Sequence, residues 1–140
     1  MLRAEQTLDI IYGSVARMAL PGLAEYRFGS FEMKSYDELK WRDDYQAWIT
    51  DETGDVPCPG GESKKQFEKR ILEAYACITG KLLLKAASNS AFVLCHGGTI
   101  TYIMEYLLPG QKKFYKWQPK PGRGYTLSYI SGQFQGYEKI

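Results

Sequence analysis

Apolar side chains recur every three or four residues in two stretches of the chain, which is the spacing of one helix face. The first stretch covers residues 4–18, and Pro21-Gly22 after it is a signal for the helix to stop. The second follows Ser63, where the tetrapeptide S-K-K-Q is a capping box. Its stripe is the most regular in the chain and comprises Phe67, Ile71, Ala74, Ile78 and Leu82. The pattern predicts helices over residues 4–18 and from residue 64 onward.

Shorter elements are expected between these helices and after them. Ser35 opens a second capping box, S-Y-D-E, which predicts a helix that continues toward Trp48. The glycines and prolines of residues 51–61 predict a loop. Residues 91–95 form a continuous apolar run, A-F-V-L-C, which is typical of a strand buried on both faces. An apolar segment over residues 100–108 predicts one more helix.

The end of the chain has the pattern of two strands. Residues 124–130 and 133–140 alternate in the manner of strands, and Ser131-Gly132 between them predicts a tight hairpin. The order strand, turn, helix before this hairpin indicates an α/β sheet. Because no internal repeat, low-complexity tract or linker interrupts the pattern, we expect residues 1–140 to form a single domain.

Composition narrows the class of protein. The 140 residues are 44% hydrophobic and 24% charged, a mix that can bury a core and excludes disordered and collagen-like chains. No apolar run approaches the roughly 18–20 residues of a membrane span, and the N-terminus has no apolar signal-peptide core. Three widely spaced cysteines, Cys58, Cys77 and Cys95, suit reduced thiols. We therefore expect a cytoplasmic protein without membrane attachment.

Charge is unevenly distributed although the net charge is only +2. Between Tyr106 and Tyr137 there is no carboxylate. Five cations gather in the same stretch: Lys112, Lys113, Lys116, Lys120 and Arg123. Such a stretch raises the local potential for an anionic ligand or a polyanion. A solvated surface that binds nothing explains the same pattern.

His96 is the only histidine and the first candidate for chemistry. It follows the expected strand and precedes Gly97-Gly98 and a helix whose N-cap we expect at Thr99. Ligands of open α/β sheets bind at the carboxyl ends of strands, and glycines let a ligand approach the backbone. A histidine bonded only to neighbouring backbone is the alternative, but the two glycines favour a site. One histidine and three dispersed cysteines imply no metal.

Other catalytic motifs fail on inspection. No G-x-S-x-G is present for serine catalysis. Cys95 ends the expected strand, but the six residues after it include no arginine, which a cysteine phosphatase would need. We therefore expect Cys95 to be a small buried hydrophobe. No dinucleotide or P-loop fingerprint exists, and no cofactor is expected.

Four segments, in order along the whole chain, resemble those of the histidine phosphatase superfamily, the phosphoglycerate mutase-like proteins. Residues 3–7 are similar to its R-A-x-Q-T segment, and residues 20–32 to its L-x-E…F-G-x-[WF]-E segment. Residues 59–63 resemble its P-G-G-E-S turn, and residues 93–98 its second histidine motif, V-x-x-H-G-G. The segment 36–63 looks closest to bacterial small-molecule phosphatases, including α-ribazole phosphatases.

The resemblance implies a three-layer α/β fold, a sheet with flanking helices, and a small phosphorylated substrate or inorganic phosphate as the ligand. Arg3 would bind phosphoryl oxygens through its guanidinium, and Gly97 would lie against the phosphate. His96 would stabilise charge on the phosphoryl group. Glu25 would be the general acid that protonates the leaving oxygen. Trp41, Tyr45 and Trp48 would contact an organic group or pack under a cap.

The resemblance also implies that something is missing. In the family a different histidine, in an R-H-G motif upstream of R-A-x-Q-T, attacks phosphorus and carries it as phosphohistidine. Here R-A-E-Q-T begins at residue 3, so the central N-terminal strand and the nucleophile are absent from this chain, which we expect to be inactive as given. Two sheet edges would then be open, and pairing with another molecule, such as a homo-oligomer, would close them.

Three interpretations remain at this point. We favour a working phosphatase whose sequence starts at an internal methionine. A natural pseudoenzyme that binds a phosphate ligand or a protein is the second. The third is nucleic-acid binding by the basic and aromatic residues 112–123, which we favour least because the net charge is near neutral.

Overall fold

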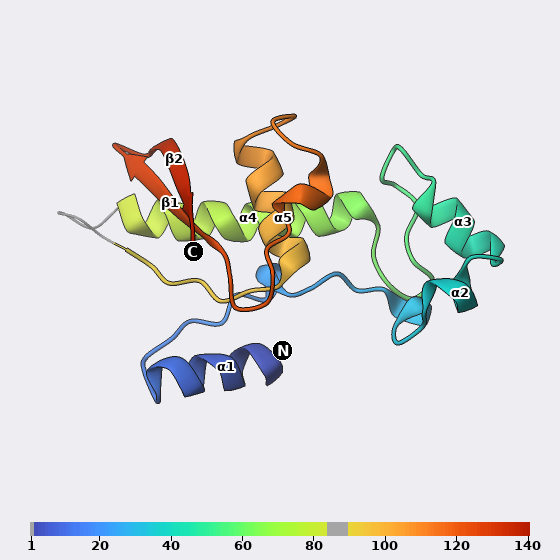
Figure 1. Ribbon diagram of the computed structural model, residues 1–140, viewed down its shortest axis with the longest axis horizontal. Helices are drawn as coiled ribbons and strands as arrows, with labels where there is room; N and C mark the ends of the chain where they lie inside the picture. The colour runs from blue at the N-terminus through green and yellow to red at the C-terminus, as the bar shows by residue number, and fades with distance from the viewer. Residues whose placement is uncertain (1, 84–89) are drawn as a thin grey trace. The chain divides into compact units, whose positions relative to one another are not determined.

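The computed structural model describes residues 2–83 and 90–140 (Figure 1). The chain is mixed α/β, as predicted. Its helices are α1 (Leu2–Tyr12), α2 (Tyr36–Leu39), α3 (Asp43–Ile49), α4 (Lys64–Leu83) and α5 (Gly97–Leu107). Three short 3₁₀ turns are η1 (Pro21–Leu23), η2 (Gly29–Phe31) and η3 (Phe114–Trp117), and two strands, β1 (Tyr125–Ile130) and β2 (Gln133–Lys139), form one antiparallel sheet.

The chain divides into two compact units, which are considered one at a time. One is Tyr26–Arg70, and the other combines Met1–Glu25 with Ile71–Ile140. The single domain and the three-layer arrangement stay predictions. No helix among residues 2–83 and 90–140 has both the length and the apolar character that crossing a bilayer requires.

Both capping boxes are confirmed. The Ser63 amide donates to the Gln66 side chain at 2.9 Å, and the Gln66 amide donates to the Ser63 hydroxyl at 3.2 Å. The Ser35 amide likewise donates to the Glu38 carboxylate at 2.7 Å. The helix expected to run from Ser35 toward Trp48 is interrupted, because α2 ends at Leu39 and α3 begins only at Asp43.

The predicted end of the first helix is wrong. The apolar spacing indicated residues 4–18, but α1 ends at Tyr12. Gly13 follows with φ of +66°, a left-handed conformation that glycine adopts without steric cost and that terminates helices. Its amide donates to the Asp9 carbonyl at 2.9 Å, which satisfies one carbonyl of the last turn.

The buried strand expected at residues 91–95 is also wrong. These residues have no regular secondary structure, and Phe92 and Val93 are 54% and 40% exposed. A strand needs a neighbour for its backbone hydrogen bonds. Within the described part of the chain, β1 pairs with β2, and no strand lies along residues 91–95.

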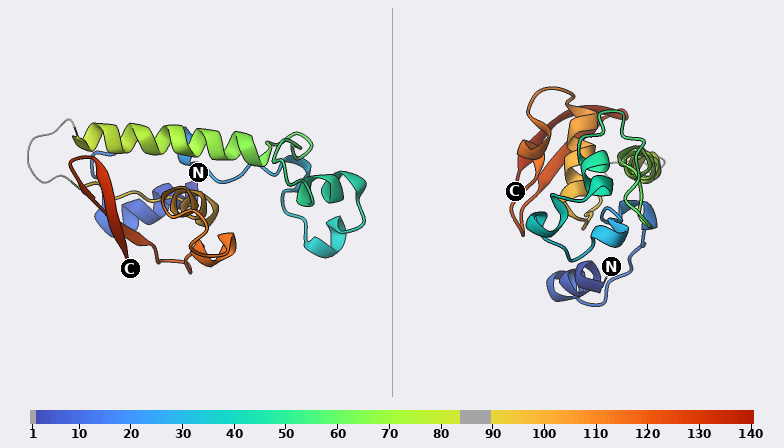
Figure 2. Two further views of the ribbon diagram at one scale, coloured as in Figure 1. Left: turned by 90° about the horizontal axis from the view of Figure 1, so that it is seen from above. Right: turned by 90° about the vertical axis from the view of Figure 1, so that its right-hand side faces the viewer.

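The terminal hairpin is confirmed. Ser131 and Gly132 form the two-residue turn, with φ of +48° and +79°. Positive φ at both positions is the signature of a type I′ turn, whose twist matches that of paired strands. Tyr129 of β1 reaches α4, where its hydroxyl is hydrogen-bonded to that of Tyr75. Figure 2 shows the turn of the hairpin near the C-terminal end of α4.

Candidate functional site

His96 lies at the N-cap of α5, between the extended residues that precede it and the helix that begins at Gly97. Its backbone is extended, with φ of −100° and ψ of 161°. Thr99, the N-cap that we expected, is instead the third residue of the helix. The imidazole is therefore held at the junction of an extended segment and a helix, although the strand that we expected before it is not formed.

Arg3 of α1 contacts His96 across 93 positions of sequence. Its Nη2 donates to His96 Nδ1 at 3.3 Å. A guanidinium has only donors, so Nδ1 acts as the acceptor and the ring proton belongs on Nε2. Burial and the positive charge of Arg3 lower the pKa of His96 below its ordinary value, and Glu25 opposes them only in part. The imidazole is therefore neutral at pH 7.

Glu25 completes the group of predicted residues. It follows η1 closely and lies near enough to act electrostatically on both His96 and Cys95. Burial, with a smaller contribution from Glu25, raises the pKa of the Cys95 thiol to about 11. The thiol is therefore protonated at neutral pH, as suits a cysteine that is not a nucleophile. Cys95 is half-buried, whereas we expected it to be a buried hydrophobe.

Thr99 links the segments that carry these residues, a role that the sequence did not reveal. It is fully buried, and its Oγ1 donates to the Leu23 carbonyl at 3.2 Å. Leu23 ends η1, two residues before Glu25. The hydrogen bond thus joins the first turn of α5, which begins beside His96, to the segment that positions Glu25.

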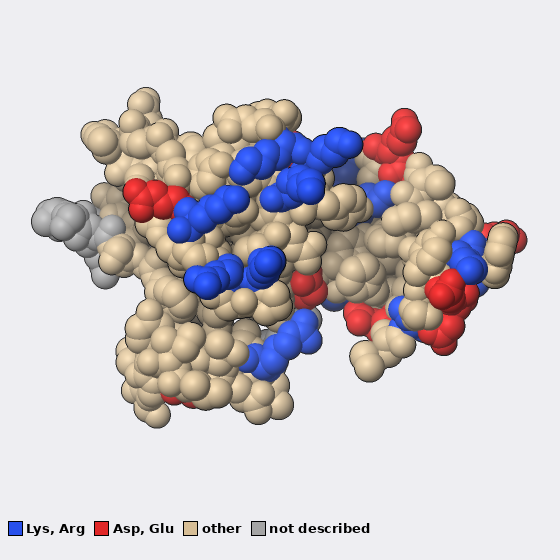
Figure 3. Space-filling view, viewed as in Figure 1, with Lys and Arg blue, Asp and Glu red and all other residues tan. Residues whose placement is uncertain are grey.

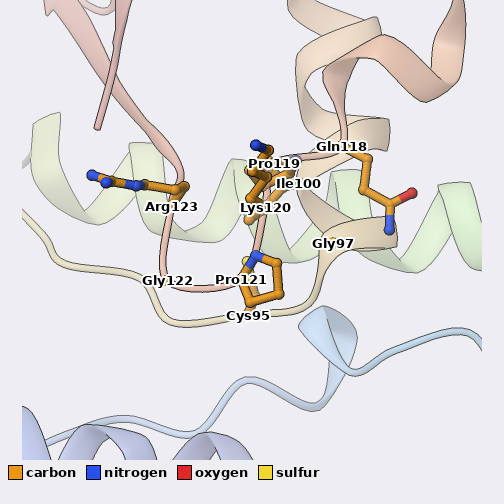
Figure 4. Close-up of a pocket in the computed structure, with 9 residues that line it drawn as sticks. All are labelled: Cys95, Gly97, Ile100, Gln118, Pro119, Lys120, Pro121, Gly122 and Arg123. Atoms are coloured by element: carbon orange, nitrogen blue, oxygen red, sulfur yellow. The ribbon is translucent and has the colours of Figure 1, made fainter.

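A pocket of about 210 Å³ adjoins Gly97 (Figure 4). A Cβ at Gly97 would lie 3.1 Å from Nε2 of Gln118, so glycine lets this amide lie close to the backbone. Nothing in the sequence around Gln118 marks it as a residue of the site. The residues that line the pocket are Cys95, Gly97, Ile100, Gln118, Pro119, Lys120, Pro121, Gly122 and Arg123.

Comparison with known proteins decides the family. The profile of the histidine phosphatase superfamily (branch 1) matches residues 1–136. The chain belongs to this superfamily. It is also similar to the 2,3-bisphosphoglycerate-dependent phosphoglycerate mutase of Bradyrhizobium diazoefficiens, with 34% identity over 104 residues. That match covers 65% of this chain and 50% of the mutase, so the chain spans about half the length of this relative. No solved structure matches the chain.

In this member of the histidine phosphatase superfamily the structure brings the predicted site residues together. Arg3 and His96 are in contact, Glu25 is near enough to influence His96, and Gly97 follows directly. The roles that the resemblance gave to these residues stay predictions.

The three aromatic residues singled out in the sequence belong to the other unit, Tyr26–Arg70. Tyr45 and Trp48 line a pocket of about 390 Å³ there, together with Phe28 and Phe31. Trp41 is 85% exposed and does not line this pocket. This pocket is distinct from the one beside Gly97.

Proposed function

We propose that this histidine phosphatase domain binds the phosphoryl group of a small phosphomonoester, or inorganic phosphate, at Arg3, His96 and Gly97. The contact between Arg3 and His96 carries the proposal. These residues are 93 positions apart in the sequence, and the fold brings together a guanidinium and an imidazole, two groups that donate hydrogen bonds to an anion. The guanidinium offers two parallel donors to phosphoryl oxygens. The neutral His96 keeps its Nε2 proton for a further hydrogen bond.

Glu25 would act as the general acid. In transfer of the phosphoryl group to a nucleophile, the P–O bond to the alcohol breaks and the leaving oxygen takes a proton from Glu25. Arg3 and His96 would stabilise the charge that builds on the phosphoryl oxygens meanwhile. These roles require a carboxyl group close to the histidine. The electrostatic influence of Glu25 on His96 supports that placement.

The phosphohistidine step needs a histidine besides His96, but His96 is the single histidine of the 140 residues. Loss of a covalent nucleophile costs several orders of magnitude in rate. We infer that these residues alone bind phosphate but do not turn over an ester. Robust hydrolysis of an aryl phosphate by the 140-residue chain would overturn this inference.

The apolar run at residues 91–95, which is exposed over residues 91–93, supports the view that the sheet is completed by another strand. A strand placed between it and the hairpin would complete the three-layer sheet of the family. A second copy of the chain could instead pair with residues 91–95 and with the free edge of the hairpin. The resulting homo-oligomer would satisfy the same backbone groups. Light scattering after size-exclusion chromatography tests the oligomer. A stable monomer with a cooperative thermal transition would contradict it.

The finer assignment is a cytoplasmic phosphatase of the α-ribazole type, on the resemblance of residues 36–63. A pseudoenzyme that binds a phosphate ligand is the alternative favoured by the single histidine. Nucleic-acid binding by residues 112–123 is the other alternative, and a steep salt dependence of retention on a polyanion would support it.

Calorimetric titration with inorganic phosphate tests the site. Arg3→Ala and His96→Ala are each expected to weaken binding about tenfold, since each removes a hydrogen bond to a charged group. Arg17→Ala is the matched control, because Arg17 is an arginine of the same unit that pairs with Asp9 and belongs to no part of the proposed site. Equal affinity in the wild type and all three variants would refute the site.

A further inference from the structure

The pocket in the Tyr26–Arg70 unit has the composition of a binding site for a small molecule. Its volume of about 390 Å³ lies within the range of such sites, which are mostly apolar with a few polar groups that orient the ligand. Aromatic rings of the kind that line it pack well against a further ring, edge to face or offset. Five of its ten lining residues are aromatic, namely Phe28, Phe31, Tyr36, Tyr45 and Trp48.

Two side chains of opposite charge, Glu32 and Lys34, also line this pocket. Neither of them forms an ion pair with a residue in the ranges 2–83 and 90–140. The Phe28 amide donates to Glu32 Oε1 at 3.1 Å, and Oε2 has no hydrogen bond to the described part of the chain. Lys34 influences the Glu38 carboxylate electrostatically but is not paired with it. The pocket therefore offers a ligand one anionic and one cationic group.

A type II turn fixes the spacing of these two charges. The Lys34 amide donates to the Phe31 carbonyl at 3.3 Å, and Glu32, in the second position, has φ of −54° and ψ of 140°. Met33, in the third position, has φ of +60°, where glycine is favoured because a side chain is strained there. Such strain clusters at sites that hold ligands. Met33 is 100% exposed, so no packing within the described residues offsets the strain, and a ligand in the pocket would cover this side chain.

We propose that this pocket binds a small zwitterion that carries an aromatic ring, of which an aromatic amino acid is the simplest example. The ring would pack among the aromatic side chains, the ammonium would donate to Glu32 Oε2, and Lys34 would donate to the carboxylate. An amino acid carries both charges on one carbon, which suits two partners placed two residues apart on one turn. An ion of a single sign would leave one of these partners unused.

The surface around the pocket agrees with a ligand that has both charges. Over α2 and α3, which supply Tyr36, Tyr45 and Trp48, Figure 3 shows both acidic and basic side chains. A surface of mixed sign attracts neither anions nor cations strongly over a distance, so selection depends on the two charges at the pocket itself. The inference does not depend on the phosphate site proposed above.

Ligands that each lack one group test the proposal on the 140-residue chain by calorimetry. Phenylalanine has the ring and both charges, phenylpropionate lacks the ammonium, phenethylamine lacks the carboxylate, and alanine lacks the ring. Phenylalanine is expected to bind about two- to fivefold more tightly than either singly charged analogue, as for a charge pair at an exposed site. It is expected to bind at least about tenfold more tightly than alanine, because only phenylalanine buries a ring. Equal affinity for phenylalanine and alanine, or no binding of phenylalanine, would overturn the proposal.

Two variants should each remove one of these preferences. Glu32→Gln is expected to abolish the preference for phenylalanine over phenylpropionate and to keep the preference over phenethylamine, whereas Lys34→Gln should do the reverse. Glutamine at position 32 can still accept from the Phe28 amide, so the local structure is retained. The control Glu52→Gln, Lys65→Gln removes the same two charges from exposed positions of the same unit outside the pocket, and both preferences should survive in it. Preferences that persist in the pocket variants, or that the control loses as well, would refute the site.

Discussion

Replacing Arg70 by methionine should destabilise the Tyr26–Arg70 unit severely, because it strands a buried charge. The Glu62 side chain is 1% exposed. Arg70 donates two hydrogen bonds to this carboxylate, from Nε to Oε2 at 2.9 Å and from Nη2 to Oε1 at 2.6 Å. The Arg27 amide donates to Oε1 at 2.9 Å, and the Arg27 guanidinium lies 3.5 Å from Oε2 but is largely exposed. Methionine would keep the apolar stem of Arg70 while leaving Glu62 without its main counter-charge.

The expected cost follows from burial. Breaking a buried ion pair by removing one partner costs about 3–5 kcal/mol, and we take the lower end because Arg27 remains nearby. That is a large part of the roughly 5–15 kcal/mol that stabilises a typical domain. With a urea m-value of about 1–3 kcal/mol/M, the midpoint of unfolding should fall by about 1–3 M. Tryptophan fluorescence measures this unfolding, because Trp48 is connected to the Glu62 cluster. The Trp48 indole donates to the Tyr26 hydroxyl, which in turn donates to the Glu62 carbonyl.

Arg42→Met is the matched control. Arg42 also grips a carboxylate with two bonds, to Asp44 at 2.9 and 2.6 Å, but this pair is much more exposed. Exposed pairs contribute at most about 1 kcal/mol, so the midpoint should move little. Equal losses in the two variants, or a loss below about 1 kcal/mol for Arg70→Met, would refute the reasoning from burial.

The ionisation of Glu62 makes the stability of the Tyr26–Arg70 unit depend on pH. Burial alone would raise the pKa of Glu62, but the bonds from Arg70 and the Arg27 amide outweigh it, and the pKa lies below the ordinary 4.5. A carboxyl whose pKa is lower in the folded state contributes stability above its unfolded pKa and loses it as pH falls through the folded value. Urea midpoints of the wild type should therefore fall below about pH 4.5, and more steeply than those of Glu62→Gln.

Three further predictions concern the other unit. Thr99→Val should lower the free energy of unfolding by about 1–3 kcal/mol, measured by urea titration, because it leaves the buried Leu23 carbonyl without its donor; an unchanged midpoint would contradict that role. Lys112→Met should lower the melting temperature by an amount equivalent to about 0.5–2 kcal/mol, because the Lys112 ammonium lies 4.1 Å from the centre of the Trp117 ring. A variant as stable as the wild type would exclude a stabilising cation–π contact. Inorganic phosphate should raise the pKa of His96, followed by NMR; an unmoved titration curve would mean that phosphate binds elsewhere.

Local sequence by itself determined the elements whose signals lie within a few consecutive residues. The capping boxes at Ser35 and Ser63 and the type I′ turn at Ser131 are satisfied by atoms three or four residues away at most. The order of four short motifs also identified the superfamily. These features do not depend on how distant parts of the chain pack.

Tertiary structure decided the rest, because the deciding partners are distant in sequence. The apolar run at residues 91–95 is not a strand here, since a strand depends on a neighbouring backbone and not on its own side chains. The resemblance named Arg3 and His96, but only the fold brings Nη2 to 3.3 Å from Nδ1. No local pattern marked Gln118 for its place over Gly97, because close packing is a property of segments that meet in space.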